Sequence, residues 1–197
     1  MIDGPLVFVD IDTQRDFLEP TGVLFIPGSE IILDNLARLT RFASEYNIPV
    51  IATACAHRPD DEELRDFPPH CLVGTPGQEP IKATARPESV ILSPDAHLLS
   101  EPPLHLTIQK RRYDVFSHPA AGRIFELYSK ENPTFVTYGV ATEYCVKAAV
   151  SGLLDRGYRV AVIVDAIRAI EAAREPEILT EFANRGALLT LTGNICG

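Results

Sequence analysis

Short apolar runs rich in β-branched residues recur along the chain, and stretches with apolar residues at helical spacing separate most of them. Such runs, bounded by glycine, proline and polar residues, predict buried strands. They cover residues 6–11, 49–53, 89–92, 106–109, 134–138, 158–164 and 187–191. The helical spacing predicts helices over residues 29–46, 120–129, 143–156 and 172–185. Residues 54–88 have neither pattern and predict a long ordered loop, a kind of segment that is commonly functional.

Strands that alternate with helices of this length imply βαβ units and a parallel sheet covered by helices on both faces. We therefore predict an α/β fold with three layers, α/β/α, around a central, mainly parallel sheet of about six strands, similar to Rossmann-like folds. The chain shows no internal repeat, low-complexity segment or linker. We expect residues 1–197 to form a single domain.

Composition narrows the choice of partners. Of the 197 residues, 46% are hydrophobic, and the formal net charge is −9, which makes nucleic acid or an anionic membrane an unfavourable partner. No apolar run approaches the roughly 20 residues of a membrane span. The apolar N-terminal run predicts a first strand rather than a signal peptide, so we expect a cytoplasmic protein whose four cysteines are free thiols.

Ligands of a parallel α/β sheet bind at the carboxyl ends of its strands, and several polar residues follow the predicted strands directly. Asp12 follows the first strand and could act as a general base, although Asp10 and Asp16 are rivals nearby. Lys110 follows the strand at 106–109 and could pair with a carboxylate, or it could be a solvated surface lysine. These residues are the first candidates for chemistry.

Cys145 follows the glycine turn after the strand at 134–138, at the expected first turn of the next helix. The positive end of a helix dipole favours thiolate over thiol, and the free N–H groups there could bind an oxyanion. A buried, unreactive thiol is the alternative for any single cysteine.

A possible metal site lies in the long loop. Cys55, His57 and His70 are plausible zinc ligands, and Glu63 or its neighbour Glu62 could add an oxygen. The two histidines could instead hydrogen-bond to the backbone.

Three motifs resemble those of one protein family. The segment DTQRDF at 12–17 resembles the D-x-Q-x-D-F opening of the isochorismatase-like cysteine hydrolases. GVATEYCV at 139–146 is similar to their nucleophile motif, with nicotinamidases the nearest group. HCLVGTPG at 70–77 resembles the H-C-x-x-x-T-P-G stretch of nicotinamidases, and the resemblance runs from about residue 6 to residue 191.

The resemblance implies an isochorismatase-like fold with a catalytic triad of Asp12, Lys110 and Cys145. It also implies a cis peptide bond between Val140 and Ala141, which would turn the N–H of Ala141 inward. The N–H groups of Ala141 and Cys145 would then form the oxyanion hole.

The resemblance also implies a pocket for an aromatic ring. Phe67 stands where the family has an aromatic residue that sandwiches the substrate ring against Phe17. We expect the pocket to be lined by Phe17, Phe67, Tyr113, Val140 and Tyr144.

Nicotinamidases hold a metal at the pocket rim on a D-x-H pair and a later histidine. His57 and His70 match this pattern, but Cys55 stands in place of the aspartate. A thiolate suits zinc better than manganese or magnesium. We therefore expect one divalent metal, most simply zinc, on His57 and His70 with Cys55 and Glu63, and no organic cofactor. The resemblance further implies a homo-oligomer, a dimer or tetramer.

The implied reaction is hydrolysis of a small amide through a thioester, with nicotinamide going to nicotinate and ammonia. Two alternatives stay open: a hydrolase of a carbamoyl or ureido compound, such as ureidoacrylate or N-carbamoylsarcosine, and a non-catalytic relative that binds a ligand in the same pocket. Vinyl-ether hydrolysis by an isochorismatase proper needs no nucleophilic thiol, and a structural zinc protein would leave the other motifs unexplained.

Overall fold

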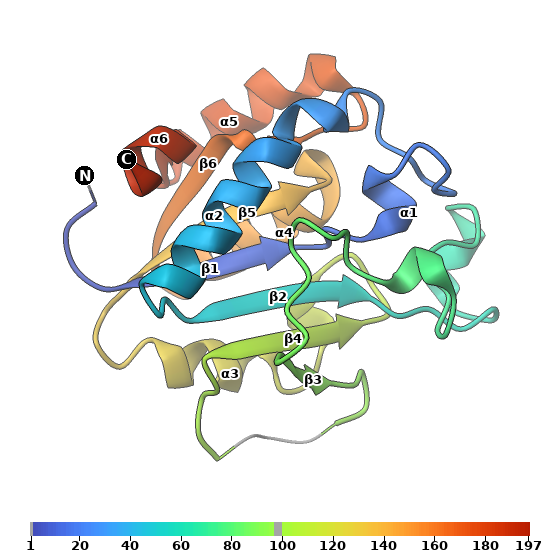
Figure 1. Ribbon diagram of the computed structural model, residues 1–197, viewed down its shortest axis with the longest axis horizontal. Coiled ribbons are helices and arrows are strands. Elements are labelled where there is room, and N and C mark those ends of the chain that lie inside the picture. The colour runs from blue at the N-terminus through green and yellow to red at the C-terminus, as the bar shows by residue number, and fades with distance from the viewer. Residues whose placement is uncertain (1, 97–99) are drawn as a thin grey trace.

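Seven strands form one sheet in the order β3-β4-β2-β1-β5-β6-β7 (Figure 1). The computed structural model describes residues 2–96 and 100–197. All neighbouring strands are parallel, which confirms the predicted fold class with seven strands rather than about six. The strands are β1 (Leu6–Ile11), β2 (Val50–Cys55), β3 (Val90–Leu92), β4 (His105–Lys110), β5 (Thr134–Val140), β6 (Arg159–Arg168) and β7 (Leu188–Thr190).

The helices are shorter than the sequence pattern predicts. They are α1 (Arg15–Leu18), α2 (Leu33–Glu45), α3 (Ala121–Tyr128), α4 (Lys147–Asp155), α5 (Glu175–Asn184) and α6 (Thr192–Cys196). A single 3-10 turn precedes α2 and another precedes α5, whereas the segment before α4 is a π-helical turn, Thr142–Val146. The pattern did not predict α1 or α6, because one turn of helix is too short to show a period of 3.6 residues.

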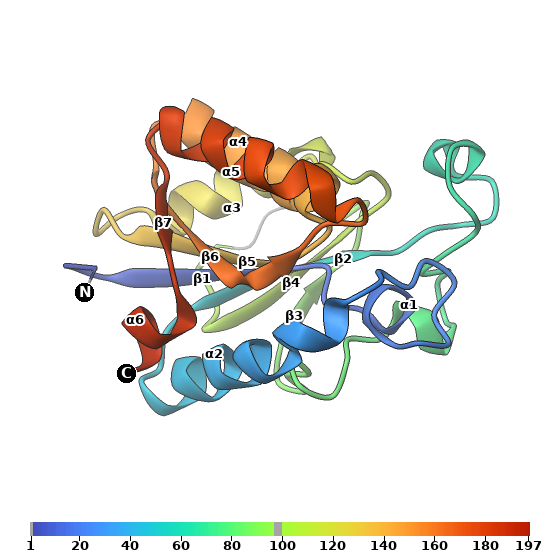
Figure 2. The same cartoon turned by 90° about the horizontal axis from the view of Figure 1, so that it is seen from above.

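The sheet lies between two helical layers (Figure 2). Helices α3, α4 and α5 cover one face, and α2 with α6 covers the other. Alternate residues of a strand point to opposite faces, so Val9 and Ile11 pack toward α3–α5 while Phe8 packs toward α2. Both faces of β5 are therefore covered.

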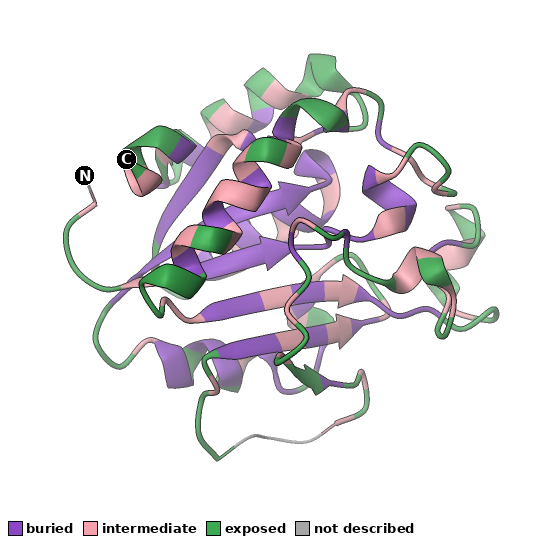
Figure 3. Cartoon of the chain, in the orientation of Figure 1, coloured by how far each residue is buried: buried purple, intermediate pink, exposed green. Residues whose placement is uncertain are grey.

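Double coverage explains why β1 and β5 are largely apolar on both faces instead of alternating. Every residue of β5 is buried, whereas two of the three residues of edge strand β3 are exposed (Figure 3). Among the residues that the structure describes, no helix is long and apolar enough to cross a membrane.

Candidate active site

Four adjacent strands bring four chemically active side chains to one edge of the sheet. Lys110 is the last residue of β4 and Cys55 the last of β2, and the two are paired in register. Asp12 follows β1 directly, and Cys145 lies in the turn after β5. Because β4, β2, β1 and β5 are neighbours whose carboxyl ends face the same way (Figure 1), these residues meet. We call them the catalytic cluster.

The ammonium of Lys110 lies at the centre of the catalytic cluster. Its Nζ is 2.7 Å from Asp12 Oδ2, 3.3 Å from Cys55 Sγ and 3.7 Å from Cys145 Sγ. The hydroxyl of Thr53 donates to the other carboxylate oxygen of Asp12 at 2.6 Å. All members of the cluster are buried, with Cys145 the most exposed at 7%. The sequence-predicted Asp12, Lys110 and Cys145 are thus brought together, and Cys55 joins them.

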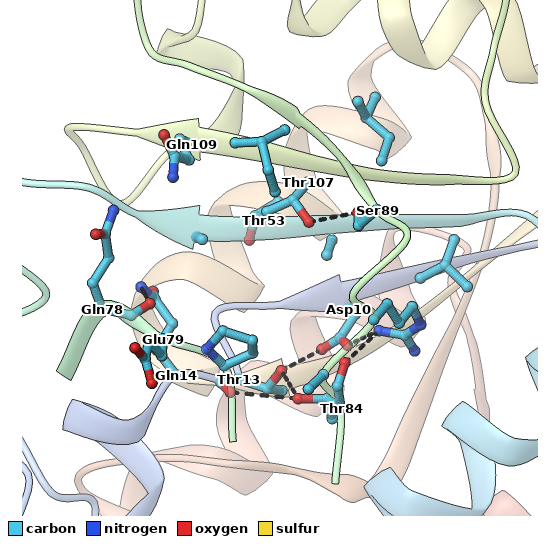
Figure 4. Close-up of a pocket in the computed structure, with 18 of the residues that line it drawn as sticks. Asp10, Thr13, Gln14, Thr53, Gln78, Glu79, Thr84, Ser89, Thr107 and Gln109 are labelled. Carbon is cyan, nitrogen blue, oxygen red and sulfur yellow. Dashed lines mark hydrogen bonds and ion pairs between the residues drawn. The ribbon is translucent and has the colours of Figure 1, made fainter. Parts of the chain in front are cut away.

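The other two candidate bases are held by different partners. Asp10 faces a separate cavity of about 380 Å³, where its carboxylate accepts hydrogen bonds from Arg86 at 2.8 Å and Thr13 at 2.9 Å (Figure 4). Asp16 accepts from the backbone N–H of Cys71 at 2.6 Å. Asp12 is therefore the carboxylate that faces Lys110 and the thiols.

Gln14, the glutamine of the D-x-Q-x-D-F segment, has a positioning role that the motif alone does not define. Its side-chain nitrogen donates to the carbonyl of Cys55 at 2.8 Å, and its side-chain oxygen accepts from the N–H of Cys55 at 2.7 Å. This pair of hydrogen bonds fixes the end of β2 against the chain after β1. Asp12 itself has a φ of 48°, in the left-handed region that few side chains adopt.

The charges of the catalytic cluster are strongly coupled. Burial raises the pKa of Asp12, and negative charge on Cys55 adds to this effect. Burial opposes the charge on Lys110, but Asp12 and the two thiols outweigh it, so the pKa of Lys110 lies well above its usual range. The result is an ammonium beside a carboxylate that is a stronger proton acceptor than an exposed aspartate.

The pKa values of the two thiols shift in opposite directions. The hydrogen bond with Cys145 lowers the pKa of Cys55 well below its usual range, and the charge of Lys110 acts in the same direction. The same hydrogen bond, with burial, raises the pKa of Cys145. The thiol of Cys145 therefore holds its proton more firmly than the thiol of Cys55 does.

Cys145 lies in the π-helical turn and not in the first turn of α4, which begins at Lys147. The helix expected from residue 143 starts late because the N–H groups of both Tyr144 and Val146 donate to the carbonyl of Ala141, each at 3.1 Å. The carboxylate of Glu143 holds this turn against the chain after β6, because it accepts hydrogen bonds from the backbone N–H groups of residues 170 and 171. The peptide bond between Val140 and Ala141 is cis, as the resemblance implied.

A cavity of about 30 Å³ opens above Cys145. Four of the five predicted pocket residues line it: Phe17, Phe67, Tyr113 and Tyr144. Val140 does not, because its side chain is fully buried in the core beneath α2.

Leu24 and Ile170 also line this cavity. They carry no sequence signal, because isolated aliphatic residues in loops look alike whether they pack against protein or substrate. The ring of Phe67 meets that of Tyr144 edge-on, with centroids 5.3 Å apart, so the pocket does have an aromatic wall.

The predicted metal ligands also converge. Donor atoms of Cys55, His57, Glu63 and His70 all lie within 4.8 Å of one another. Nε2 of His57 is buried without a hydrogen-bond partner and lies 3.6 Å from Glu63. An unpartnered imidazole nitrogen that faces a thiol and a carboxylate fits a bound cation.

The outer nitrogens of both histidines are already engaged. Nδ1 of His57 lies 3.3 Å from the carboxylate of Asp61, and Nδ1 of His70 lies 2.8 Å from the carbonyl of Pro68. Such contacts orient metal-binding histidines and leave Nε2 for the metal. The set of one thiolate, two imidazoles and one carboxylate suits tetrahedral zinc.

Comparison with known proteins agrees with this geometry. The family model described as the isochorismatase domain matches residues 6–193. A sequence search of curated proteins found no match. Among solved structures, a pyrazinamidase from Pyrococcus horikoshii in complex with zinc is 25% identical, with a TM-score of 0.76, and the match covers 95% of this chain and 99% of that one.

Two further structures show the same fold at lower identity. The nicotinamidase from Bacillus subtilis is 22% identical with a TM-score of 0.79, covering 95% of this chain and 99% of that one. The N-carbamoylsarcosine amidase from Thermoplasma acidophilum is 22% identical with a TM-score of 0.78, covering 98% and 100%. Because the family model matches residues 6–193, which is nearly the whole chain, the chain belongs to the isochorismatase family.

Proposed function

We propose that this protein is a cysteine hydrolase that cleaves the C–N bond of a small amide through a thioester on Cys145. The convergence of Asp12, Lys110 and Cys145 on one buried point supports this proposal most directly. A non-catalytic relative would not need to bury a lysine and an aspartate beside a thiol, since burying charge is costly.

Asp12 acts as the general base. It takes the proton of Cys145, and the thiolate attacks the amide carbon while Lys110 balances the negative charge. The N–H groups of Ala141 and Cys145 stabilise the tetrahedral oxyanion, each worth roughly 3–4 kcal/mol. Asp12 then passes its proton to the departing ammonia. Water activated by the same carboxylate hydrolyses the thioester.

Cys55, His57, Glu63 and His70 would hold a zinc ion at the rim of the cavity. Four protein ligands close a tetrahedral site, so a bound zinc would act as a Lewis acid toward one end of the substrate where Glu63 gives up its place. The chain's own contribution there is to present an unpartnered imidazole nitrogen and a low-pKa thiol at the cavity wall.

Nicotinamide is the substrate that we propose first. The aromatic wall formed by Phe67, Tyr113 and Tyr144 suits a flat ring. The nicotinamidase and pyrazinamidase structures with the same fold support this choice as analogues.

A carbamoyl or ureido compound is the second candidate. The cavity above Cys145 is small, about 30 Å³, and a carbamoyl group is smaller than a ring amide. The N-carbamoylsarcosine amidase with the same fold supports this candidate as an analogue.

A substrate panel with matched cysteine variants tests the proposal. Ammonia release should be measured from nicotinamide, pyrazinamide, N-carbamoylsarcosine and a ureido acid, with zinc content determined on the same sample. Cys145→Ala should abolish release, while Cys196→Ala, which alters a free cysteine outside the cavity, should retain it. If no compound in the panel releases ammonia, the amidase assignment is wrong.

A further inference from the structure

Cys55 has a second relationship besides its place among the metal ligands: its thiol faces the nucleophile. The sulfurs of Cys55 and Cys145 and a carboxylate oxygen of Asp12 all lie within 4.8 Å of one another. Both sulfurs contact the same ammonium, that of Lys110, at 3.3 and 3.7 Å. The chain therefore places a second thiol within reach of its catalytic thiol.

We propose that Cys55 and Cys145 form a reversible disulfide when hydrogen peroxide reaches the active site. This switches the hydrolase off and protects Cys145 from irreversible oxidation. The consequence for activity rests on the proposed function, but the disulfide itself does not.

The geometry needs only local movement. A disulfide has an S–S length of about 2.05 Å, so the two sulfurs must approach by about 3 Å at most, which side-chain rotation can largely provide. The third buried cysteine is not placed for this reaction, because the sulfur of Cys71 contacts the carbonyl of Gly77 at 3.7 Å.

One cavity gives access to both sulfurs. Cys55 and Cys145 both line the space above the nucleophile. Hydrogen peroxide is smaller than the amide substrates proposed for this cavity, so the route that admits substrate to Cys145 also admits peroxide to both sulfurs.

The reaction balances in two steps. Asp12 takes the proton of Cys145, and the thiolate attacks one oxygen of hydrogen peroxide. The O–O bond breaks, the departing hydroxide takes the proton from Asp12 as water, and Cys145 becomes a sulfenic acid. The thiolate of Cys55 then attacks this sulfur, the S–O bond breaks, and the second hydroxide leaves as water with a proton drawn from solvent. One peroxide is reduced and the two thiols are oxidised to a disulfide.

Mass spectrometry of the full-length protein tests the proposal. As-purified and chelator-treated samples are exposed to hydrogen peroxide and digested without reduction. We expect a cross-linked peptide pair containing Cys55 and Cys145 in at least one sample. Amidase activity should fall about tenfold or more as the link forms, and dithiothreitol should restore it.

The variants separate a switch from simple damage. Cys55→Ser and Cys55→Ala should lose the cross-link and carry Cys145 to the sulfinic acid, which dithiothreitol does not reverse. Cys196→Ala should behave as the natural sequence. The proposal is overturned if the Cys55–Cys145 peptide pair is absent from both samples, or if peroxide converts Cys145 to the sulfinic acid as fast with Cys55 present as without it.

The test also separates this inference from the proposed function. A Cys55–Cys145 link in a protein that hydrolyses no amide would support the disulfide proposal and refute the hydrolase proposal. Amide hydrolysis without the link would support the hydrolase proposal and refute the disulfide proposal.

Discussion

Lys110 Nζ lies 2.7 Å from Asp12 Oδ2, and both side chains are essentially inaccessible to solvent. Buried ion pairs are rarely the most stable way to fill a core, because both charges lose their hydration. The Asp12–Lys110 pair is therefore better explained by chemistry than by stability. It holds a base and a positive charge beside Cys145.

Replacing Lys110 by methionine should destabilise the fold and abolish hydrolysis. The change leaves Asp12 buried and unpaired, which costs about 3–5 kcal/mol. The double variant Asp12→Asn/Lys110→Met should recover most of this stability without recovering activity. Chemical denaturation measures the first effect and ammonia release the second; a double variant no more stable than Lys110→Met would contradict the ion-pair account.

Gly139 cannot accept a side chain. Its φ is 116°, and an added Cβ would lie 2.0 Å from the carbonyl oxygen of Ile11. We expect Gly139→Ala to lower the free energy of unfolding by about 3 kcal/mol, the upper end for overpacking. Gly122→Ala, in α3 with open space around the new methyl group, is the control and should be stabilising by about 0.5–1 kcal/mol. Equal stabilities for the two variants would contradict the close approach of β1 and β5.

Zinc binding should depend on the histidines and on the thiol. His57→Ala removes the imidazole whose Nε2 lacks a partner and should lower zinc content about tenfold or more. Cys55→Asp restores an oxygen ligand and should shift the preference from zinc toward manganese. Metal analysis after equilibration with zinc and manganese together measures this preference. An unchanged preference for zinc in Cys55→Asp would show that Cys55 is not a ligand.

His105 should make the fold less stable in mild acid. Burial lowers its pKa from 6.5, and the charge of Arg86 adds to this effect despite the nearby Glu88. His105 therefore binds a proton less readily in the folded state than in the unfolded chain. The free energy of unfolding falls as the pH drops below 6.5. His105→Gln should remove this part of the dependence of stability on pH. Thermal denaturation from pH 7 to pH 5 measures it, and parallel profiles for both proteins would contradict the prediction.

Much of the fold follows from the pattern of the sequence. The strands β1 and β5 are largely apolar because both faces of the sheet are covered there, and polar residues mark where the strands end. Asp12, Lys110 and Cys145 could therefore be placed at one edge of the sheet before the strand order was known.

The rest depends on contacts between distant segments. Asp12 rather than Asp10 faces Lys110 because Asp10 is held by Arg86, a residue 76 positions away. Cys55 meets Cys145 because β2 and β5 both border the end of β1. Local spacing carries no information about either relationship.

In the proposed mechanism, Cys145 carries the acyl group of the substrate. Samples of the protein quenched in acid during turnover of an active amide should contain the acyl group on the peptide bearing Cys145, and hydroxylamine should remove it. Cys145→Ala should show neither the adduct nor ammonia release. Undiminished ammonia release from Cys145→Ala, with no adduct on Cys145 in the natural sequence, would contradict the account.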